Sequence, residues 1–359
     1  MNTDIEFFSS ASKKTVAVAL SGGVDSSVCT ALMKAAGHNV ITITLDLFPP
    51  QEDSKDSTLQ AARRIADHLG VPHHICDVRT LFQKQVIKSF VESYCRGETP
   101  LPCALCNQHV KFGAFVDFAE TLGADTIVTG HYVRKKDIAP GVAYLHRALN
   151  TKKDQSYFLF GINRAVLPKL FFPLGELTKE NVRSIARVLG LPSHDRAESQ
   201  DICFVGNRHY TDIVHEHVSQ EALPHPGNIV DKTGQCIGKH NGLLYYTVGQ
   251  RKGLQVTLGY PAYVTAIDTS TNTLIVGKKE DLACTSLVVK EVNWICPPKV
   301  PTFEALAKVR STQEPTPAHI EVAGSEMRVT FHFPEYGVAS GQACVLYDDD
   351  RLLGGGWIT

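Results

Sequence analysis

The chain has 359 residues, of which 43% are hydrophobic and 20% are charged, and its formal net charge is −1. This length exceeds one ordinary domain core and predicts two or three domains. The composition is typical of a globular protein and excludes a mainly disordered chain, and the absence of any run of about 18 apolar residues excludes a membrane-spanning helix. In the first residues, acids precede a weak apolar patch and lysines follow it, which is not the order of a secretory signal. We therefore expect a cytoplasmic protein.

The ten cysteines and the net charge give weaker indications. The cysteines are scattered, which does not suggest a disulfide framework, and in a reducing compartment most are expected to be small buried hydrophobes. The near-neutral charge argues against a nucleic-acid partner without excluding one, because such binding needs only a local basic face. One basic segment spans residues 134–153; on charge alone it fits a solvated loop equally well.

The first half of the chain alternates apolar β-branched runs with helical patterns. Strands are expected at residues 15–20, 40–45, 74–78 and 125–129. Helices are expected at residues 25–36 and 179–189, with another that Ser57 would cap. The apolar face of that middle helix carries Leu59, Ala62, Ile65, Ala66 and Leu69.

This alternation predicts an α/β fold with a doubly wound parallel sheet, whose ligands lie at the carboxyl ends of the strands. After about residue 207, turn signals separate short β-rich runs. We therefore predict a catalytic domain at residues 1–207, a small β-rich middle domain at 208–287 and a C-terminal β-barrel-like domain at 288–359.

The most specific motif is Ser21-Gly22-Gly23-Val24-Asp25-Ser26-Ser27, directly after a predicted strand and at the start of a helix. Paired glycines let the backbone approach an anion, and the helix amino terminus supplies N–H groups. The motif has no Walker lysine and resembles the pyrophosphate loop of N-type ATP pyrophosphatases. Asp25 has two possible roles: a cap, whose loss would cost about 1 kcal/mol, or a carboxylate for Mg²⁺ beside pyrophosphate.

The cysteines indicate the substrate class. Cys103 and Cys106 form a C-x-x-C pair after a proline-bounded segment, and Cys203 lies far away in sequence. A C-x-x-C pair fits a redox pair, half a zinc site or half a cluster site. Because prolines precede it, the helix start of a thioredoxin-like pair is not expected here.

Two aromatic segments are open to a functional or a packing interpretation. His131 could act as a base or a phosphate donor, or it could simply pack beside Tyr132. Residues 157–160 (YFLF) could stack a base, although core packing is the preferred interpretation.

Seven segments occur in the order of one enzyme family. They are SGGVDSS, TPLPCALCNQHVKFG, VTGHYV, KKDQSYFL, SQDICFVG, YTVGQRKGL and GQACVLYDDDRLLGGG. Together they resemble the tRNA-specific 2-thiouridylases over nearly the whole chain. Leu101 stands where the family has asparagine, and some relatives carry aspartate where Cys103 stands.

The resemblance implies a role for each matching residue. Cys106 would be the nucleophile, Cys203 would carry the persulfide, and the two would form a transient disulfide. Asp25 would join them as a catalytic residue. The residues implied to bind ATP are Ala19, Leu20, Ser21, Gly22, Gly23, Val24, Asp25, Ser26, Leu45 and Gly130. Those implied to contact the target base or tRNA are Leu101, Pro102, Cys103, Lys153, Asp154, Gln155, Arg310 and Ser311.

The implied reaction is ATP-dependent 2-thiolation of the wobble uridine of tRNA, releasing AMP and pyrophosphate. The implied cofactors are ATP and Mg²⁺. The implied partners are tRNAs for Lys, Glu and Gln, a persulfide-donating carrier or cysteine desulfurase, and a thiol reductant. Adenylation turns the C2 oxygen of uridine into a leaving group, and a persulfide sulfur is a soft nucleophile at neutral pH.

Three alternatives remain open on the sequence. Cys103, Cys106 and Cys203 could hold an iron–sulfur cluster that carries the sulfide, although the persulfide route is preferred. The chain could be an amidating synthetase of the same loop superfamily, which would leave Cys106 and Cys203 unexplained. It could also be a non-catalytic tRNA-binding protein, which the intact serines and Asp25 disfavour.

Overall fold

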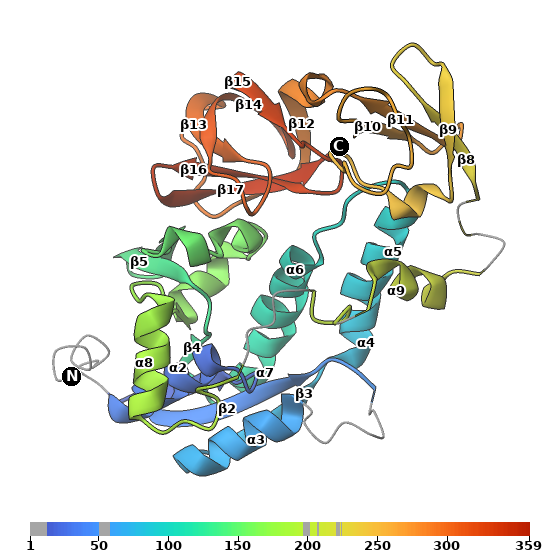
Figure 1. Cartoon of the computed structure of the whole chain (residues 1–359). Helices are drawn as coiled ribbons and strands as arrows, with labels where there is room; N and C mark the ends of the chain where they lie inside the picture. Colours follow the sequence, from blue (N-terminus) through green and yellow to red (C-terminus); the bar gives the residue numbers. More distant parts are fainter. Residues whose placement is uncertain (1–12, 50–57, 197–201, 207, 220–222, 224) are drawn as a thin grey trace. The chain divides into compact units, whose positions relative to one another are not determined.

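The computed structural model describes residues 13–49, 58–196, 202–206, 208–219, 223 and 225–359 (Figure 1). The chain divides into two compact units. The first comprises residues 1–83, 105–200 and 350–352, and the second comprises residues 84–104, 201–349 and 353–359. The predicted Ser57 cap and residues 199–201 of the Cys203 motif lie outside the described residues.

The first unit is built on a five-stranded sheet in the order β3-β2-β1-β4-β7. Every neighbouring pair in it runs parallel, which confirms the predicted parallel sheet. Its strands are β1 (Thr15–Ala19), β2 (Asn39–Asp46), β3 (His73–Asp77), β4 (Thr126–Val128) and β7 (Leu170–Phe171). The central strand β1 is apolar because both of its faces are covered: Val16, Ala17 and Val18 are at most 1% exposed.

Helices cover both faces of this sheet (Figure 1). Helices α2 and α8 share one core with Val16 and Val18 of β1, whereas α3 packs through Ala62, Ile65 and Ala66 in a separate cluster. The α-helices described in this unit are α2 (Val24–Ala35), α3 (Thr58–Leu69), α4 (Arg79–Phe82), α7 (Phe115–Thr121) and α8 (Lys179–Val188). The π-helix η2 (Cys106–Ala114) precedes α7, and the 3₁₀ turns are η3 (Thr151–Lys153), η4 (Ser156–Leu159) and η5 (Arg164–Lys169).

The basic segment forms a hairpin rather than a solvated loop. Strand β5 (Val133–Ala139) pairs antiparallel with β6 (Val142–Arg147). Two of its cations have acidic partners in the same unit: Arg134 pairs with Asp350, and Lys135 Nζ lies 3.0 Å from an oxygen of Asp137. Part of the positive charge that the sequence displays is therefore used inside the fold.

The second unit contains two β structures, as predicted. A four-stranded sheet has the order β10-β11-β8-β9, and six further strands close into a barrel because β12 pairs with both β15 and β17. The sheet strands are β8 (Gly227–Val230), β9 (Cys236–His240), β10 (Tyr263–Asp268) and β11 (Thr273–Gly277). The barrel strands are β12 (Ala283–Trp294), β13 (Thr302–Lys308), β14 (Thr316–Ala323), β15 (Glu326–Tyr336), β16 (Ala343–Asp348) and β17 (Arg351–Ile358).

Short helices precede and connect these β structures. They are η1 (Gln83–Ile87), α5 (Lys88–Cys95), α6 (Pro102–Leu105), α9 (Tyr210–His217), η7 (Leu243–Tyr245) and η8 (Lys279–Leu282). Helices α5 and α9 meet through stacked rings: the centroids of Tyr94 and Tyr210 are 4.4 Å apart at 17° between planes. Removal from water raises the pKa of Tyr210 to about 12, so this ring pair stays uncharged at neutral pH.

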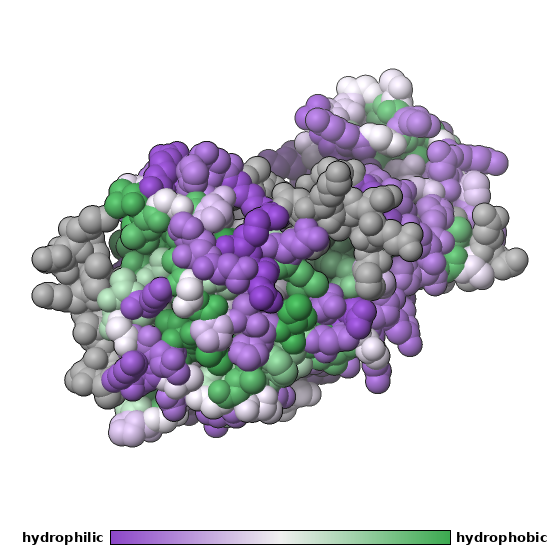
Figure 2. Space-filling model, turned by 90° about the horizontal axis from the view of Figure 1, so that it is seen from below, coloured by the Kyte–Doolittle hydropathy of each residue, from purple (hydrophilic) through white to green (hydrophobic). Residues whose placement is uncertain are grey.

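The predicted fold class is confirmed, and the element bounds agree within a few residues. Among the described residues, none of the helices is long and apolar enough to cross a membrane. Hydrophilic and hydrophobic residues lie interspersed on the face that Figure 2 shows, as is usual for protein surfaces.

Candidate functional site

The glycine-rich loop lies where the direction of the sheet reverses. From β1 the chain builds outward through β2 and β3, and it later returns to the other side of β1 with β4. Loops at the carboxyl ends of the two strands beside such a switch point form the usual ligand crevice of an open α/β sheet. The loop at 21–23 follows β1, and Gly130 follows β4. Both predicted ATP-binding segments therefore meet at this edge.

Gly22 and Gly130 are the positions where a side chain would disturb the loop. Gly22 has φ +75°, and a Cβ there would lie 2.8 Å from the Cβ of Ala61 in α3. A Cβ on Gly130 would lie 3.2 Å from both the Asp25 Cβ and the Ser26 nitrogen. Glycine at 130 thus lets the segment after β4 touch the start of α2.

The serine hydroxyls of the motif shape the loop. Ser26 Oγ accepts a hydrogen bond from the Ser21 backbone N–H at 3.1 Å, and Ser27 Oγ donates to the Gly23 carbonyl at 2.7 Å. Both serines are at most 4% exposed. These contacts fix the turn that directs the first N–H groups of α2.

Asp25 is the partner of a buried lysine rather than a helix cap. Gly23 is the N-cap of α2 and makes no side-chain cap hydrogen bond. The Asp25 carboxylate instead lies 2.7 and 2.8 Å from Lys179 Nζ through its two oxygens, and the Tyr132 hydroxyl donates to Oδ1 at 2.9 Å. The capping alternative is therefore wrong, because the carboxylate points to α8 and Tyr132.

Lys179 is a residue of this site that sequence reasoning missed. Its side chain is 8% exposed, against 30% for Asp25, and its Nζ lies 5.7 Å from the centroid of the Tyr132 ring. A lysine is almost never this buried without an acidic partner. The sequence placed Lys179 at a helix start, but 154 residues separate it from Asp25, so no local pattern could link them.

Cys106 begins the π-helix η2, and the C-x-x-C pair is helical. Cys103 lies in α6, which leads directly into η2. The expectation that the prolines exclude a helix start is wrong, because Pro102 occupies the first turn, where its missing N–H is not needed. Cys106 is buried, and Cys103 is exposed. π-helical segments are rare and often mark functional sites.

Asn107 and Phe112 of η2 contact other parts of the first unit. The Asn107 amide donates to the Phe158 carbonyl at 3.0 Å, and the ring of Phe112 lies 5.4 Å from that of His131. His131 follows Gly130, so this packing links the helix that begins at Cys106 to the edge that carries the glycine loop.

His131 is an uncharged imidazole in this setting. Removal from water lowers its pKa well below the ordinary value, and the nearby Lys111 adds to the effect. Thr129 Oγ1 lies 2.8 Å from His131 Nδ1.

For residues 157–160, the core-packing interpretation is confirmed: Tyr157, Leu159 and Phe160 are at most 1% exposed.

Lys153, Asp154 and Gln155 differ in what they offer to a ligand. The Asp154 side chain is 1% exposed and accepts hydrogen bonds from the Ala148 N–H at 2.9 Å and the Ser156 hydroxyl at 2.8 Å. The Gln155 side chain accepts from the Tyr132 N–H at 2.9 Å. Lys153 lines an open pocket of about 440 Å³, whose other lining residues are Lys179, Glu180, Arg183 and Arg187 of α8.

The second unit holds the remaining predicted site residues. Leu101 and Pro102 are buried, whereas Cys103 and Cys203 are exposed. Cys203 precedes Phe204, which is 8% exposed and packs its ring edge against Phe90 of α5, 5.0 Å between centroids. A buried anchor thus holds the segment that presents Cys203.

Arg310 and Ser311 lie after β13, in the turn that leads to β14. The Arg310 guanidinium donates to the Gly337 carbonyl at 2.5 Å and to the Val248 carbonyl at 3.0 Å. These bonds tie the turn to two other loops of the same unit.

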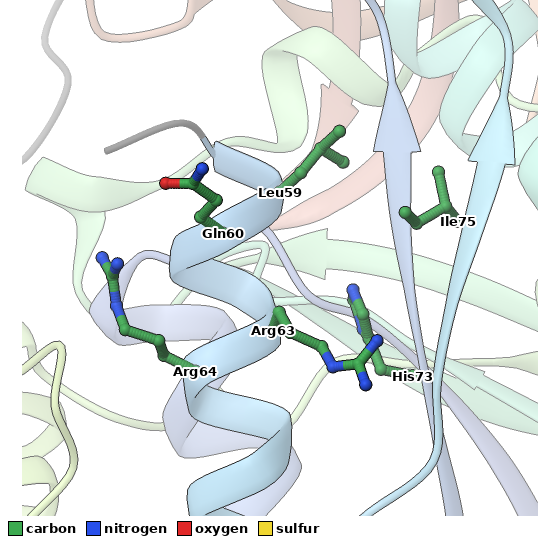
Figure 3. A pocket seen from close by; sticks show the side chains of 6 residues that line it. All are labelled: Leu59, Gln60, Arg63, Arg64, His73 and Ile75. Atoms are coloured by element: carbon green, nitrogen blue, oxygen red, sulfur yellow. The ribbon is translucent and has the colours of Figure 1, made fainter. Parts of the chain in front are cut away.

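A second hollow of about 380 Å³ contains none of the residues that the sequence singled out for chemistry (Figure 3). It is lined by Leu59, Gln60, Arg63 and Arg64 of α3 and by His73 and Ile75 of β3. Arg63 extends toward His73, and the pKa of this imidazole is lowered by burial and then by the Arg63 charge.

Comparison with known proteins identifies the family. Residues 14–207 match the model of the tRNA methyl transferase HUP domain, 212–278 that of the tRNA methyl transferase PRC-barrel domain, and 284–358 that of the aminomethyltransferase beta-barrel domain. The chain is 43% identical to the tRNA-specific 2-thiouridylase MnmA of Beijerinckia indica, covering 96% of this chain and 84% of the relative. It is also 43% identical to that of Rickettsia prowazekii, covering 96% and 98%.

Some of the solved structures that match share little sequence with this chain. One of them is the U34-tRNA thiolase NcsA from Methanococcus maripaludis with its [4Fe-4S] cluster, at 16% identity and a TM-score of 0.38, covering 59% of this chain and 69% of that one. A similarity this low supports no inference about chemistry. The curated relatives, by contrast, match almost the whole chain. The chain belongs to the tRNA-specific 2-thiouridylase family.

Proposed function

We propose that this protein is a tRNA-uridine 2-sulfurtransferase that uses ATP to convert the wobble uridine of tRNA to 2-thiouridine. The observation that carries the proposal lies in the first unit. A glycine loop lies at the switch point of a parallel sheet and is followed by the carboxylate of Asp25. The helix that begins at Cys106 packs against the same edge of the sheet through the rings of Phe112 and His131. A pyrophosphate-type loop beside a cysteine suits activation of an oxygen followed by sulfur transfer.

The proposed reaction has three balanced steps. The C2 oxygen of uridine attacks the α-phosphorus of ATP, and pyrophosphate leaves. The terminal sulfur of a Cys203 persulfide then attacks C2, and AMP leaves with the former uridine oxygen. Finally the Cys106 thiolate attacks Cys203 Sγ, so that the persulfide S–S bond breaks, the thiolated base is released and a Cys106–Cys203 disulfide forms. An external thiol must reduce this disulfide before the next cycle.

The loop residues have distinct proposed tasks. The N–H groups at the start of α2 bind the phosphates of ATP, and glycine at 22 and 130 lets the loop pack closely against α3 and the segment after β4 pack against the start of α2. Asp25 has the carboxylate oxygens that Mg²⁺ prefers and, at 30% side-chain exposure, can be reached from the crevice. We propose that Asp25 holds Mg²⁺ with the triphosphate, and that Lys179 and Tyr132 orient its carboxylate.

Recognition of tRNA is proposed at residues from both units. Lys153 and the exposed Cys103 are suited to direct contact, whereas Asp154 and Gln155 support the segment from within. The tRNAs proposed are those for Lys, Glu and Gln, and the sulfur source is a persulfide-donating carrier or a cysteine desulfurase.

The ranges of the matching family models support the division into domains at 1–207, 208–287 and 288–359.

The proposal is tested by following the oxygen that leaves uridine. tRNA carrying ¹⁸O at C2 of the wobble uridine is incubated with the protein, ATP, Mg²⁺ and a persulfide source. The account predicts AMP and pyrophosphate, with one ¹⁸O in the phosphate of AMP and 2-thiouridine in the tRNA. ADP and phosphate as products, or AMP without the label, would rule out adenylation of the C2 oxygen.

A further inference from the structure

The pocket beside α8 has the composition of a phosphate-binding surface. Four of its five lining side chains are cationic and one is acidic. Lys179, Arg183 and Arg187 come from α8, and Lys153 comes from η3. Its volume of about 440 Å³ is many times that of a water molecule in the liquid, about 30 Å³, so the pocket has room for a phosphodiester.

The acidic residue of the pocket is engaged at the helix start. Hydrogen bonds from its own backbone N–H and from the Thr178 hydroxyl lower the pKa of the Glu180 carboxyl, with smaller contributions from Arg183 and Lys153. Glu180 therefore remains an anion close to these two cations. It cannot neutralise the whole lining, because Arg187 adds a further exposed cation one turn along α8.

The pocket is better suited to an RNA backbone than to a nucleotide. None of its lining residues is aromatic or aliphatic, so the pocket has no apolar wall of the kind that usually encloses an adenine ring. Guanidinium groups at positions i and i+4 present planar donor pairs that match phosphate oxygens. The triphosphate of ATP already has the glycine loop and the start of α2.

The pocket also lies beside the proposed reaction centre. Its Lys179 is the residue that pairs with Asp25 of the glycine loop. Its Lys153 adjoins Asp154 and Gln155, and Gln155 is bonded to the backbone of Tyr132, whose hydroxyl reaches Asp25. A phosphate bound here would hold a nucleotide next to the loop that activates the base.

We propose that Arg183 and Arg187, with Lys153, form a binding site for a backbone phosphate of tRNA next to the ATP loop. This inference rests on the proposed function, since it takes tRNA as the substrate. It adds α8 to the tRNA-contacting surface, which the sequence motifs did not include.

The test measures tRNA affinity against salt concentration for the full chain, using an unmodified tRNA transcript. Arg183→Ala/Arg187→Ala should reduce the slope of log K against log salt by about 0.7 to 0.9 for each phosphate that the variant no longer binds, while the affinity for ATP stays within twofold. Arg183→Lys/Arg187→Lys should keep most of the slope because it keeps the charge. The matched control is Arg63→Ala/Arg64→Ala, which removes two arginines from α3 of the same unit and should leave the slope unchanged.

An unchanged slope in the α8 double variant would overturn the inference. So would a loss of ATP affinity with an unchanged slope, since the pocket would then serve the nucleotide. Arg187→Ala alone, at an exposed position, provides a second measurement in case the double variant is unstable. The proposed function is tested by a different measurement. If wild-type protein binds tRNA with the salt dependence expected of phosphate contacts but forms no 2-thiouridine, the proposed function is refuted while the phosphate site still stands.

Discussion

At the scale of single residues, the central contact is the pairing of Asp25 with Lys179. Both carboxylate oxygens lie within 2.8 Å of Nζ, and the lysine side chain is 8% exposed. A buried ammonium requires such a partner, because an unpaired charge in the interior loses its hydration without compensation. Asp25 therefore contributes to stability as well as to the proposed chemistry.

Replacing Asp25 tests this dual role. Asp25→Ala should abolish pyrophosphate release and should also destabilise the fold by about 3 kcal/mol, the low end of the range for a broken buried pair because Asp25 is partly exposed. The smaller loss of about 1 kcal/mol that capping would give is not expected. Denaturant unfolding of Asp25→Ala and Asp25→Ala/Lys179→Met provides the comparison. The double variant should recover most of the stability; equal stability of the two variants would show that the pair is not coupled.

His131 predicts a pH dependence of stability. Its folded pKa lies well below the ordinary value of 6.5, so between these two values the unfolded chain binds a proton that the folded chain does not. Stability is then fully present above about pH 6.5 and falls as the pH decreases toward the folded pKa, by at most about 1.4 kcal/mol per pH unit. His131→Gln should flatten this part of the profile relative to wild type. A parallel profile in the variant would mean that the pKa of His131 is the same in the folded and the unfolded chain.

At the scale of elements, the loop before α2 contains two glycines, Gly22 and Gly23, that differ in backbone geometry and in the space around them. Gly22 has a positive φ and would place a Cβ 2.8 Å from that of Ala61, whereas the nearest atom to a Cβ on Gly23 is 3.7 Å away. Only Gly22 is required by the geometry of the turn itself.

This difference gives a matched pair of variants. Gly22→Ala should lose about 1 to 3 kcal/mol of stability, the usual range for a strained backbone position, and should weaken ATP binding. Gly23→Ala should unfold at the wild-type temperature. Any loss of ATP affinity in this variant would therefore mean that the new side chain keeps the backbone away from the phosphates of ATP, and not that the loop is damaged. Thermal melts and equilibrium ATP binding measure the two effects. Equal destabilisation of both variants would contradict the assigned turn.

The elements show what sequence periodicity can and cannot reveal. The strands and helices around the glycine loop were predictable, because apolar spacing and turn residues act over a few neighbours: β1 is observed at Thr15–Ala19 and α2 at Val24–Ala35. The helix through Cys103 and the π-helix from Cys106 were not, since a proline indicates a loop unless it occupies the first turn of a helix. The burial of Asp154 was not predicted either, because a charged residue in a basic segment is expected to be exposed, whereas its carboxylate accepts hydrogen bonds from the nearby Ala148 and Ser156.

At the scale of the whole molecule, the proposed thiols are distributed over two units. Cys106 belongs to the first and Cys203 to the second. The sequence motifs could assign both cysteines to sulfur chemistry, but they do not say how far apart the two cysteines lie in space. The proposed disulfide between them therefore stays a prediction. Serine in place of either should abolish thiolation, because a hydroxyl neither holds a sulfane sulfur nor acts as a comparable nucleophile. Cys103→Ser should be milder.

Single-turnover thiolation by anaerobically purified protein tests the central claim most directly. The 2-thiouridine content of the tRNA is measured by nucleoside mass spectrometry, with and without ATP and a persulfide source, alongside the iron content of the protein. The account predicts ATP-dependent 2-thiouridine from colourless, iron-free wild type, none from Cys106→Ser or Cys203→Ser, and a reduced but measurable yield from Cys103→Ser. Thiolation that appears only with bound iron and fails equally in all three variants would contradict it.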